Sequence, residues 1–93
     1  MKVYYEKASN KLDAYKLACE ILTDEYIAKF VSVKVDIDYD ESSLLIWGKG
    51  KGFELKFSFL DDHCQVNLDL SFLLKPLKKS ILGKVEKEFK THL

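Results

Sequence analysis

The sequence predicts an α+β protein, built as a two-layer sandwich in which two helices cover one face of a mainly antiparallel four-stranded sheet. Several short segments alternate apolar and polar residues at every step, as strands with one buried face do. Two longer segments repeat apolar residues at steps of three and four, as helices with one buried face do. The expected order is β-α-β-β-β-α, within a single domain that spans residues 1–93.

The N-terminal part is expected to contain a short strand, a long helix and a second strand. The short strand spans residues 3–6. Asn10 can cap the helix that follows, and Asp13 suits the first turn, where negative charge is favourable. The helix extends to about Lys29 on a row of apolar side chains that includes Tyr15 and Leu22. Residues 31–39 alternate apolar and polar side chains, which predicts a strand with one face in water.

Three further strands are expected at residues 44–47, 53–59 and 64–70. The glycines Gly48, Gly50 and Gly52 form a corner after the first of them. Short connections favour antiparallel pairing between neighbouring strands. Because each strand has one apolar face, we expect both helices on the same side of the sheet and the other side open to water.

The C-terminal helix is the most strongly patterned part of the chain. Pro76 fits the first turn of a helix, since its missing backbone N–H costs nothing there. An apolar row with a spacing of four then lies on one helical face and is expected to be core: Leu77, Ile81, Val85 and Phe89.

Two details around this helix predict packing. A glycine costs a helix about 1 kcal/mol relative to alanine, so we expect Gly83 to mark a close contact. Ahead of the proline, Phe72, Leu73 and Leu74 are expected to form an apolar knot that joins the last strand to the helix.

The charges are balanced overall but unevenly distributed. The chain has 15 basic and 15 acidic residues, so its net charge provides no general attraction to nucleic acid. All the basic residues are lysine, and arginine, which recognises phosphate and guanine bidentately, is absent. From Ser71 onward, six lysines and two glutamates make the segment net +4. Such a segment can bind anions or present a solvated face.

No pattern in the sequence predicts catalysis, a cofactor or a metal ion, and we expect a protein that is not an enzyme. Asp36, Asp38 and Asp40 begin like a calcium loop, but the sixth position is Glu41 where glycine is required. His63 follows two aspartates in what is best interpreted as a turn.

The expected location is the cytoplasm. The sequence has no apolar run of 18 residues that could form a transmembrane segment, and its N-terminus lacks the apolar core of a signal peptide. Cys19 and Cys64 lie within apolar patterns and are expected to be unpaired thiols that pack as small apolar side chains.

The open face of the sheet carries the candidate binding residues. If Leu44 and Ile46 point inward, Leu45 and Trp47 point outward among charged side chains. Two large apolar side chains in such surroundings indicate contact with a partner. The partner could be a second copy, giving a homodimer.

The chain resembles a known family over most of its length. The resemblance is carried by residues 68–89 (LDLSFLLKPLKKSILGKVEKEF), by the strand from Leu44 and Ile46 into Gly50 and Gly52, and by the long first helix. These features resemble the polyhydroxyalkanoic acid system proteins, small bacterial proteins often encoded beside genes for polyester granules. The resemblance implies the fold described above, an association of this cytoplasmic protein with polyhydroxyalkanoate granules, and a granule-associated protein as the alternative partner of the open face. It supplies no catalytic residues.

Two functions follow as hypotheses. The first is a non-catalytic accessory or interaction protein, associated with polyhydroxyalkanoate granules. The alternative is an RNA-binding module similar to a double-stranded RNA-binding domain, in which a basic patch of Lys75, Lys78 and Lys79 at the start of the last helix contacts phosphates. The missing arginine and the absent loop and helix-start motifs of such domains make nucleic acid the less favoured partner.

Overall fold

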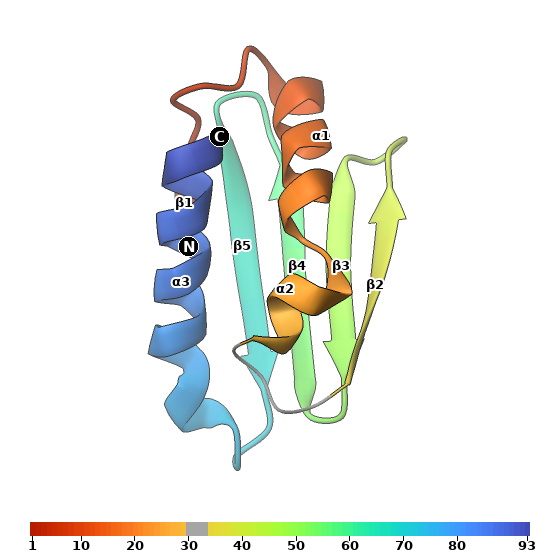
Figure 1. The fold of residues 1–93 in the computed structure, drawn as a ribbon, viewed down its shortest axis with the longest axis vertical. Helices are drawn as coiled ribbons and strands as arrows, with labels where there is room; N and C mark the ends of the chain where they lie inside the picture. Colours follow the sequence, from red (N-terminus) through yellow and green to blue (C-terminus); the bar gives the residue numbers. More distant parts are fainter. Residues whose placement is uncertain (30–33) are drawn as a thin grey trace.

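The computed structural model describes residues 1–29 and 34–93. In this part of the chain, five strands and three α-helices form one compact unit (Figure 1). The elements in chain order are β1 (Lys2–Tyr4), α1 (Lys11–Ile21), α2 (Asp24–Ala28), β2 (Val35–Asp40), β3 (Leu45–Gly50), β4 (Phe53–Phe59), β5 (His63–Leu70), the short 3₁₀ helix η1 (Lys75–Leu77) and α3 (Lys78–His92).

The strands form one sheet in the order β1-β5-β4-β3-β2, and every neighbouring pair is antiparallel. The α+β class is therefore confirmed, but the prediction of four strands was wrong. Four strands lie between α2 and α3, and β1 is the fifth. β1 takes its place by pairing with a distant segment, with Val3 opposite Cys64. Each of the five segments expected to be strands overlaps one strand of this sheet, so the predicted order β-α-β-β-β-α counted one strand too few.

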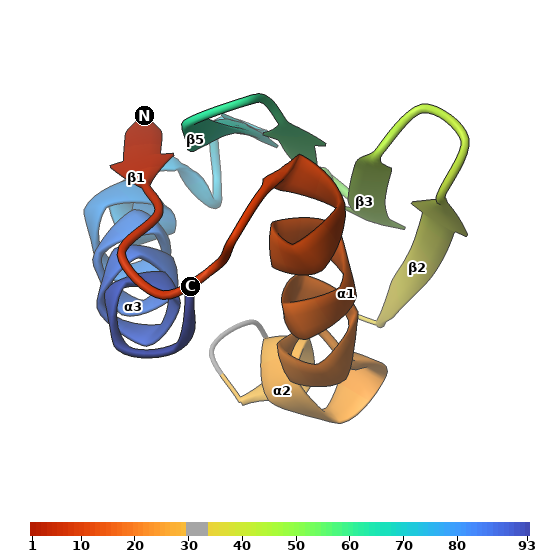
Figure 2. The ribbon, with the colours of Figure 1, turned by 90° about the horizontal axis from the view of Figure 1, so that it is seen from above.

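All three helices lie on the same side of the sheet (Figure 2). α1 and α2 cross the sheet in front of β3 and β4, and α3 lies beside β1 and β5 (Figure 1). The covered face carries the buried residues of the strands, and the opposite face has no helix over it. No helix in the described residues is long and apolar enough to span a membrane.

The core is organised around β4, whose alternate residues Phe53, Leu55, Phe57 and Phe59 are all buried. Phe57 packs against Phe89 of α3, with ring centroids 5.3 Å apart. Phe59 meets Tyr15 of α1 edge-on at 5.8 Å. The central strand thus contacts both long helices, which come from opposite ends of the sequence.

The predicted long first helix is divided into two. Its start is as predicted, because the Asn10 side chain accepts a hydrogen bond from the Asp13 N–H at 2.8 Å. α1 ends at Ile21, and Thr23 caps α2 by accepting a hydrogen bond from the Tyr26 N–H at 3.1 Å. The Leu22 carbonyl, which a continuous helix would bond internally, instead accepts the Tyr39 hydroxyl at 2.7 Å.

The C-terminal helix follows its predicted pattern and extends it. Ile81, Val85 and Phe89 are fully buried, and Leu93 continues the row with the same spacing. Leu77 is 36 % exposed because it belongs to η1, before the helical phase of α3 is established. The Leu93 carbonyl oxygen accepts backbone hydrogen bonds from Glu6, Lys7 and Ala8 at 3.0, 2.6 and 2.6 Å, so the end of α3 holds the β1–α1 connection.

The remaining strands differ from prediction mainly at their ends. β2 starts at Val35, and residues 31–33 lie outside the described residues. β3 runs on through Gly48 to Gly50 where a corner was expected. Gly48 is buried, and a Cβ there would lie only 3.0 Å from the Val35 Cγ1. This glycine therefore leaves room for the Val35 side chain and does not turn the chain.

Two predictions around the C-terminal helix were wrong. Gly83 is exposed, and a Cβ placed on it would meet nothing within 4 Å. The expected apolar knot does not form, because Phe72 and Leu73 are 86 % and 85 % exposed and only Leu74 packs against the core. The tight turn from β5 into η1, with Leu74 and Lys75 N–H groups both bonded to the Ser71 carbonyl, directs these two side chains outward.

Two glycine substitutions are expected to have opposite effects. Gly83→Ala should raise the free energy of unfolding by about 0.5–1 kcal/mol, because alanine favours the helix and has free space around it. Gly52→Ala should lower it by more than about 1 kcal/mol, because Gly52 has φ +74° and a Cβ would lie 2.7 Å from the Ser71 Oγ. Urea unfolding monitored by circular dichroism measures both. A destabilised Gly83→Ala variant would mean that the glycine has a packing role.

Candidate functional site

The open face of the sheet is built by the residues that alternate with the core. Along β3, Ile46 is buried beneath the helices, while Leu45 and Trp47 point to the uncovered side and are half-buried. The structure thus places both predicted residues on the open face. Their role in binding stays a prediction.

Trp47 is surrounded by charges from both neighbouring strands. It lies opposite Asp38 of β2 and Lys56 of β4 in the sheet register. With Leu45, Glu54 and Lys56 it lines a shallow depression of about 180 Å³. A partner that covers this depression would have to pair the Glu54 carboxylate and the Lys56 ammonium. It would also have to cover the apolar side chains of the depression.

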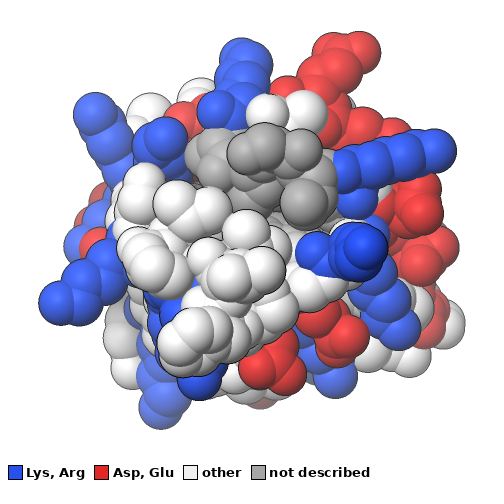
Figure 3. Space-filling view, turned by 90° about the horizontal axis from the view of Figure 1, so that it is seen from below, with Lys and Arg blue, Asp and Glu red and all other residues white. Residues whose placement is uncertain are grey.

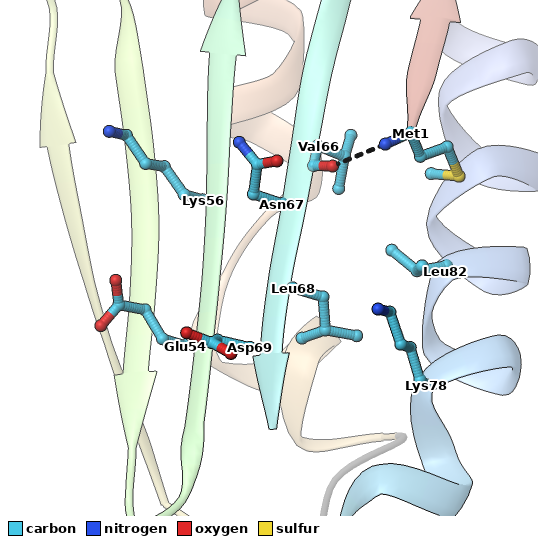
Figure 4. Close-up of a pocket in the computed structure, with 9 residues that line it drawn as sticks. All are labelled: Met1, Glu54, Lys56, Val66, Asn67, Leu68, Asp69, Lys78 and Leu82. Carbon is cyan, nitrogen blue, oxygen red and sulfur yellow. Dashed lines mark hydrogen bonds between the residues drawn. The ribbon is translucent and has the colours of Figure 1, made fainter. Parts of the chain in front are cut away.

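A second hollow of about 260 Å³ lies between β5 and α3. Figure 4 shows Leu68 of β5 pointing toward Leu82 and Lys78 of α3, below the start of β1. Glu54, Lys56, Asn67 and Asp69 form its border on the open face of the sheet. No local pattern in the sequence indicates this hollow, because its walls come from Met1 and from β4, β5 and α3, which only the tertiary structure brings together.

The lower end of the molecule carries the connection between β5 and α3. Figure 3 looks onto this end and shows an uncharged area with lysines along much of its border and carboxylates on one side. Phe72 and Leu73 are the most exposed large apolar residues described. Together with Leu77 they form what we call the apolar tip.

The predicted basic patch adjoins the apolar tip. Lys75 lies in η1, and Lys78 and Lys79 form the first residues of α3, all three exposed. Lys78 also lines the hollow between β5 and α3, so the three lysines do not all face the same surface. The sequence indicates these lysines and the apolar residues before them, but it predicts an apolar knot where the structure exposes Phe72 and Leu73.

Burial raises the pKa of the Cys64 thiol, and also that of Cys19, so neither is a thiolate near neutral pH. Both cysteines are unpaired, as predicted. No group of three His, Cys, Asp or Glu side chains that could hold a metal ion occurs among residues 1–29 and 34–93.

The Asp62–His63 pair has a structural explanation. The His63 Nδ1 lies 2.6 Å from the Asp62 Oδ1, and this hydrogen bond holds the pKa of the Asp62 carboxyl below its usual range. The Tyr5 hydroxyl donates to the carbonyl oxygens of Leu60 and His63, at 2.9 and 2.8 Å. These contacts hold the β4–β5 turn against the end of β1. They agree with the prediction of a turn at Asp61, Asp62 and His63.

Comparisons with known proteins found no relatives: no family model, no curated protein and no solved structure matches this chain. The resemblance to the polyhydroxyalkanoic acid system proteins therefore stays a prediction, and the assignment of function depends on the surfaces described above.

Replacing Trp47 tests which face it occupies. We expect Trp47→Ala to keep the fold and to lose about 1–2 kcal/mol of stability, because its side chain is only half-buried. The neighbouring Ile46→Ala is the control and should lose about 2–5 kcal/mol, since Ile46 is 1 % exposed in the core. Thermal unfolding measures both.

The same variant tests binding by the open face. If this face mediates self-association, sedimentation equilibrium should show a weaker dimer for Trp47→Ala at protein concentrations where the wild type associates. A Trp47→Ala variant that unfolds as readily as Ile46→Ala would show that Trp47 belongs to the core, and the open-face hypothesis would be wrong.

Proposed function

We propose that this protein is a non-catalytic accessory protein that attaches to an apolar surface through the apolar tip, and that this surface is the polyhydroxyalkanoate granule. The observation that carries the proposal is the exposure of Phe72 and Leu73, at 86 % and 85 %. Side chains of this size are rarely left so exposed on neighbouring positions without a partner. The family resemblance supports the choice of the polyester granule as the apolar surface.

The expected strength of attachment follows from the areas and charges involved. Burying a Phe or Leu side chain contributes about 1.5–3 kcal/mol, so the two together contribute about 3–6 kcal/mol before the cost of association. Lys75 and Lys79 adjoin these residues in sequence and are exposed. Each lysine adds about 1 kcal/mol when the surface carries negative charge. The tip alone therefore supports reversible attachment.

The chemistry of the described residues agrees with a binding role. The thiols are protonated near neutral pH, and the hydrogen bond between Asp62 and His63 stabilises the β4–β5 turn. The hollows on the surface are shallow and bordered by charged side chains. These surfaces support a protein that functions by binding another surface or molecule.

The RNA-binding alternative has less support. It requires three strands between two helices, whereas four strands lie between α2 and α3. Of the three lysines proposed to contact phosphates, Lys78 lines the hollow beside β5. We keep this alternative only as an outcome of a direct binding experiment with duplex RNA at low salt.

Sedimentation with purified polyhydroxybutyrate granules tests the granule proposal. The wild-type protein should sediment with the granules, and Phe72→Ser/Leu73→Ser should remain mainly in the supernatant. Circular dichroism should show the variant folded as the wild type is, because both side chains lie outside the core.

Leu12→Ser/Leu60→Ser provides the matched control. Leu12 and Leu60 are also exposed, at 41 % and 45 %, but they lie away from the tip. This control should sediment like the wild type. Equal sedimentation of all three proteins would show that the tip does not mediate attachment.

A further inference from the structure

The outer edge of β5 is only partly covered by β1. The pairing of β1 with β5 extends from His63 to Gln65, and Met1 adds two hydrogen bonds to Val66. β5 itself continues to Leu70. Within the described residues, no strand pairs with this edge beyond Val66.

The direction of the backbone groups on this edge follows from the hydrogen bonds above it. The Val66 N–H donates to the Met1 carbonyl at 2.7 Å, and the Met1 ammonium donates to the Val66 carbonyl at 3.0 Å. In an antiparallel ladder, alternate residues direct both backbone groups to the same neighbour. Leu68 and Leu70 therefore direct their N–H and C=O groups to the outer edge, as Val66 does.

The space next to this edge is the hollow between β5 and α3. Figure 4 shows β1 beside the upper part of β5, and below Met1 no strand of residues 1–29 and 34–93 lies between β5 and α3. Its volume is about 260 Å³, and Leu68, Leu82 and Lys78 line it. Since paired strands lie about 4.8 Å apart, the space suits one more extended segment in line with β1.

The lining of the hollow indicates the kind of segment it fits. Leu68 and Leu82 are half-buried and supply an apolar wall. The Met1 ammonium lies at one end and the Lys78 side chain at the other, while Glu54 and Asp69 lie on the border that faces the open sheet. An acidic side chain is favoured between the two cations, and an apolar one against the leucines.

We propose that this hollow binds an extended segment of a partner protein, with alternating apolar and acidic residues, as an additional strand on β5. The segment pairs its backbone with Leu68 and Leu70, and it uses a surface separate from the apolar tip. An extended segment is favoured over a folded second copy, because α3 occupies the side of the sheet where a second copy would carry its own helices. Addition of a strand to an exposed sheet edge is a recurrent mode of peptide recognition.

A synthetic peptide that copies residues 35–40 (VDIDYD) supplies an acidic and apolar probe. NMR should show that millimolar peptide shifts the Leu68 and Leu70 amide signals and slows their hydrogen exchange. The peptide VKIKYK, with lysine for aspartate, is the control and should bind at least about tenfold more weakly, the effect of 1.4 kcal/mol. If the acidic peptide leaves these amides unchanged, the proposal is wrong.

Protein variants locate the peptide. Lys78→Glu should weaken binding at least about tenfold, while Lys79→Glu, the same charge change on the next residue outside the hollow, should have a small effect. Phe72→Ser/Leu73→Ser should bind the peptide normally, which separates this proposal from the granule proposal. Equal weakening by Lys78→Glu and Lys79→Glu would indicate general charge attraction and would overturn the proposed site.

Backbone methylation of the peptide tests strand addition itself. N-methyl groups on one set of alternate residues should abolish binding, because those N–H groups face β5, and N-methyl groups on the other set should be tolerated. Equal tolerance of both sets would exclude an added strand. If the Leu68 and Leu70 amides instead exchange slowly without peptide and lose this protection when the protein is diluted, a second copy occupies the edge. That result would also overturn the proposal.

Discussion

The structure depends on covering the apolar row of β4 from one side. Phe57 and Phe59 contact Phe89 of α3 and Tyr15 of α1, so the two long helices meet the same central strand. Every other strand extends the sheet outward from β4, and each adds apolar residues to the same face. In a chain of 93 residues, of which the structure describes 1–29 and 34–93, the described core is this one apolar layer. A change that displaces either helix would therefore expose β4 directly to water.

Covering the sheet from one side determines where the protein can bind other molecules. The face away from the helices stays open, and the edge of β5 is covered only as far as β1 extends. The tight turn at Ser71 that leads the chain back to α3 leaves Phe72 and Leu73 outside the core. The apolar tip, the hollow beside β5 and the Trp47 face thus have one cause. A chain this small covers one side of its sheet and leaves the other side, part of the β5 edge and the β5–η1 turn uncovered. The lysines and carboxylates at the borders of these surfaces would favour partners of complementary charge and disfavour the others.

The three surfaces differ in the contact that each can make. The apolar tip projects from the molecule and suits an apolar surface that adapts to it. The hollow beside β5 offers directed backbone groups and suits one extended segment. The Trp47 depression is shallow and bordered by charges of both signs, and it suits a flat, complementary face. A protein at a granule surface could use the tip for attachment and leave the hollow free for a second protein.

The sequence by itself determined the elements whose patterns are local. Alternation identified the strands along most of their length, the Asn10 cap marked the start of α1, and a spacing of four placed Ile81, Val85 and Phe89 in the core. The alternation along β3 also indicated that Leu45 and Trp47 point to the face of the sheet away from Ile46. These signals succeed because each reports which side of one segment is apolar.

Only the tertiary structure decided the features that depend on distant partners. The position of β1 at the edge of the sheet depends on β5 as its neighbour, and the break after Ile21 is stabilised by the Tyr39 hydroxyl on the Leu22 carbonyl. Phe72 and Leu73 have the composition of core residues, but the turn that carries them leads away from the sheet. The hollow beside β5 lies next to the part of β5 that β1 does not pair with. Periodicity describes one segment at a time, and exposure is settled by which segments meet and where their contacts end.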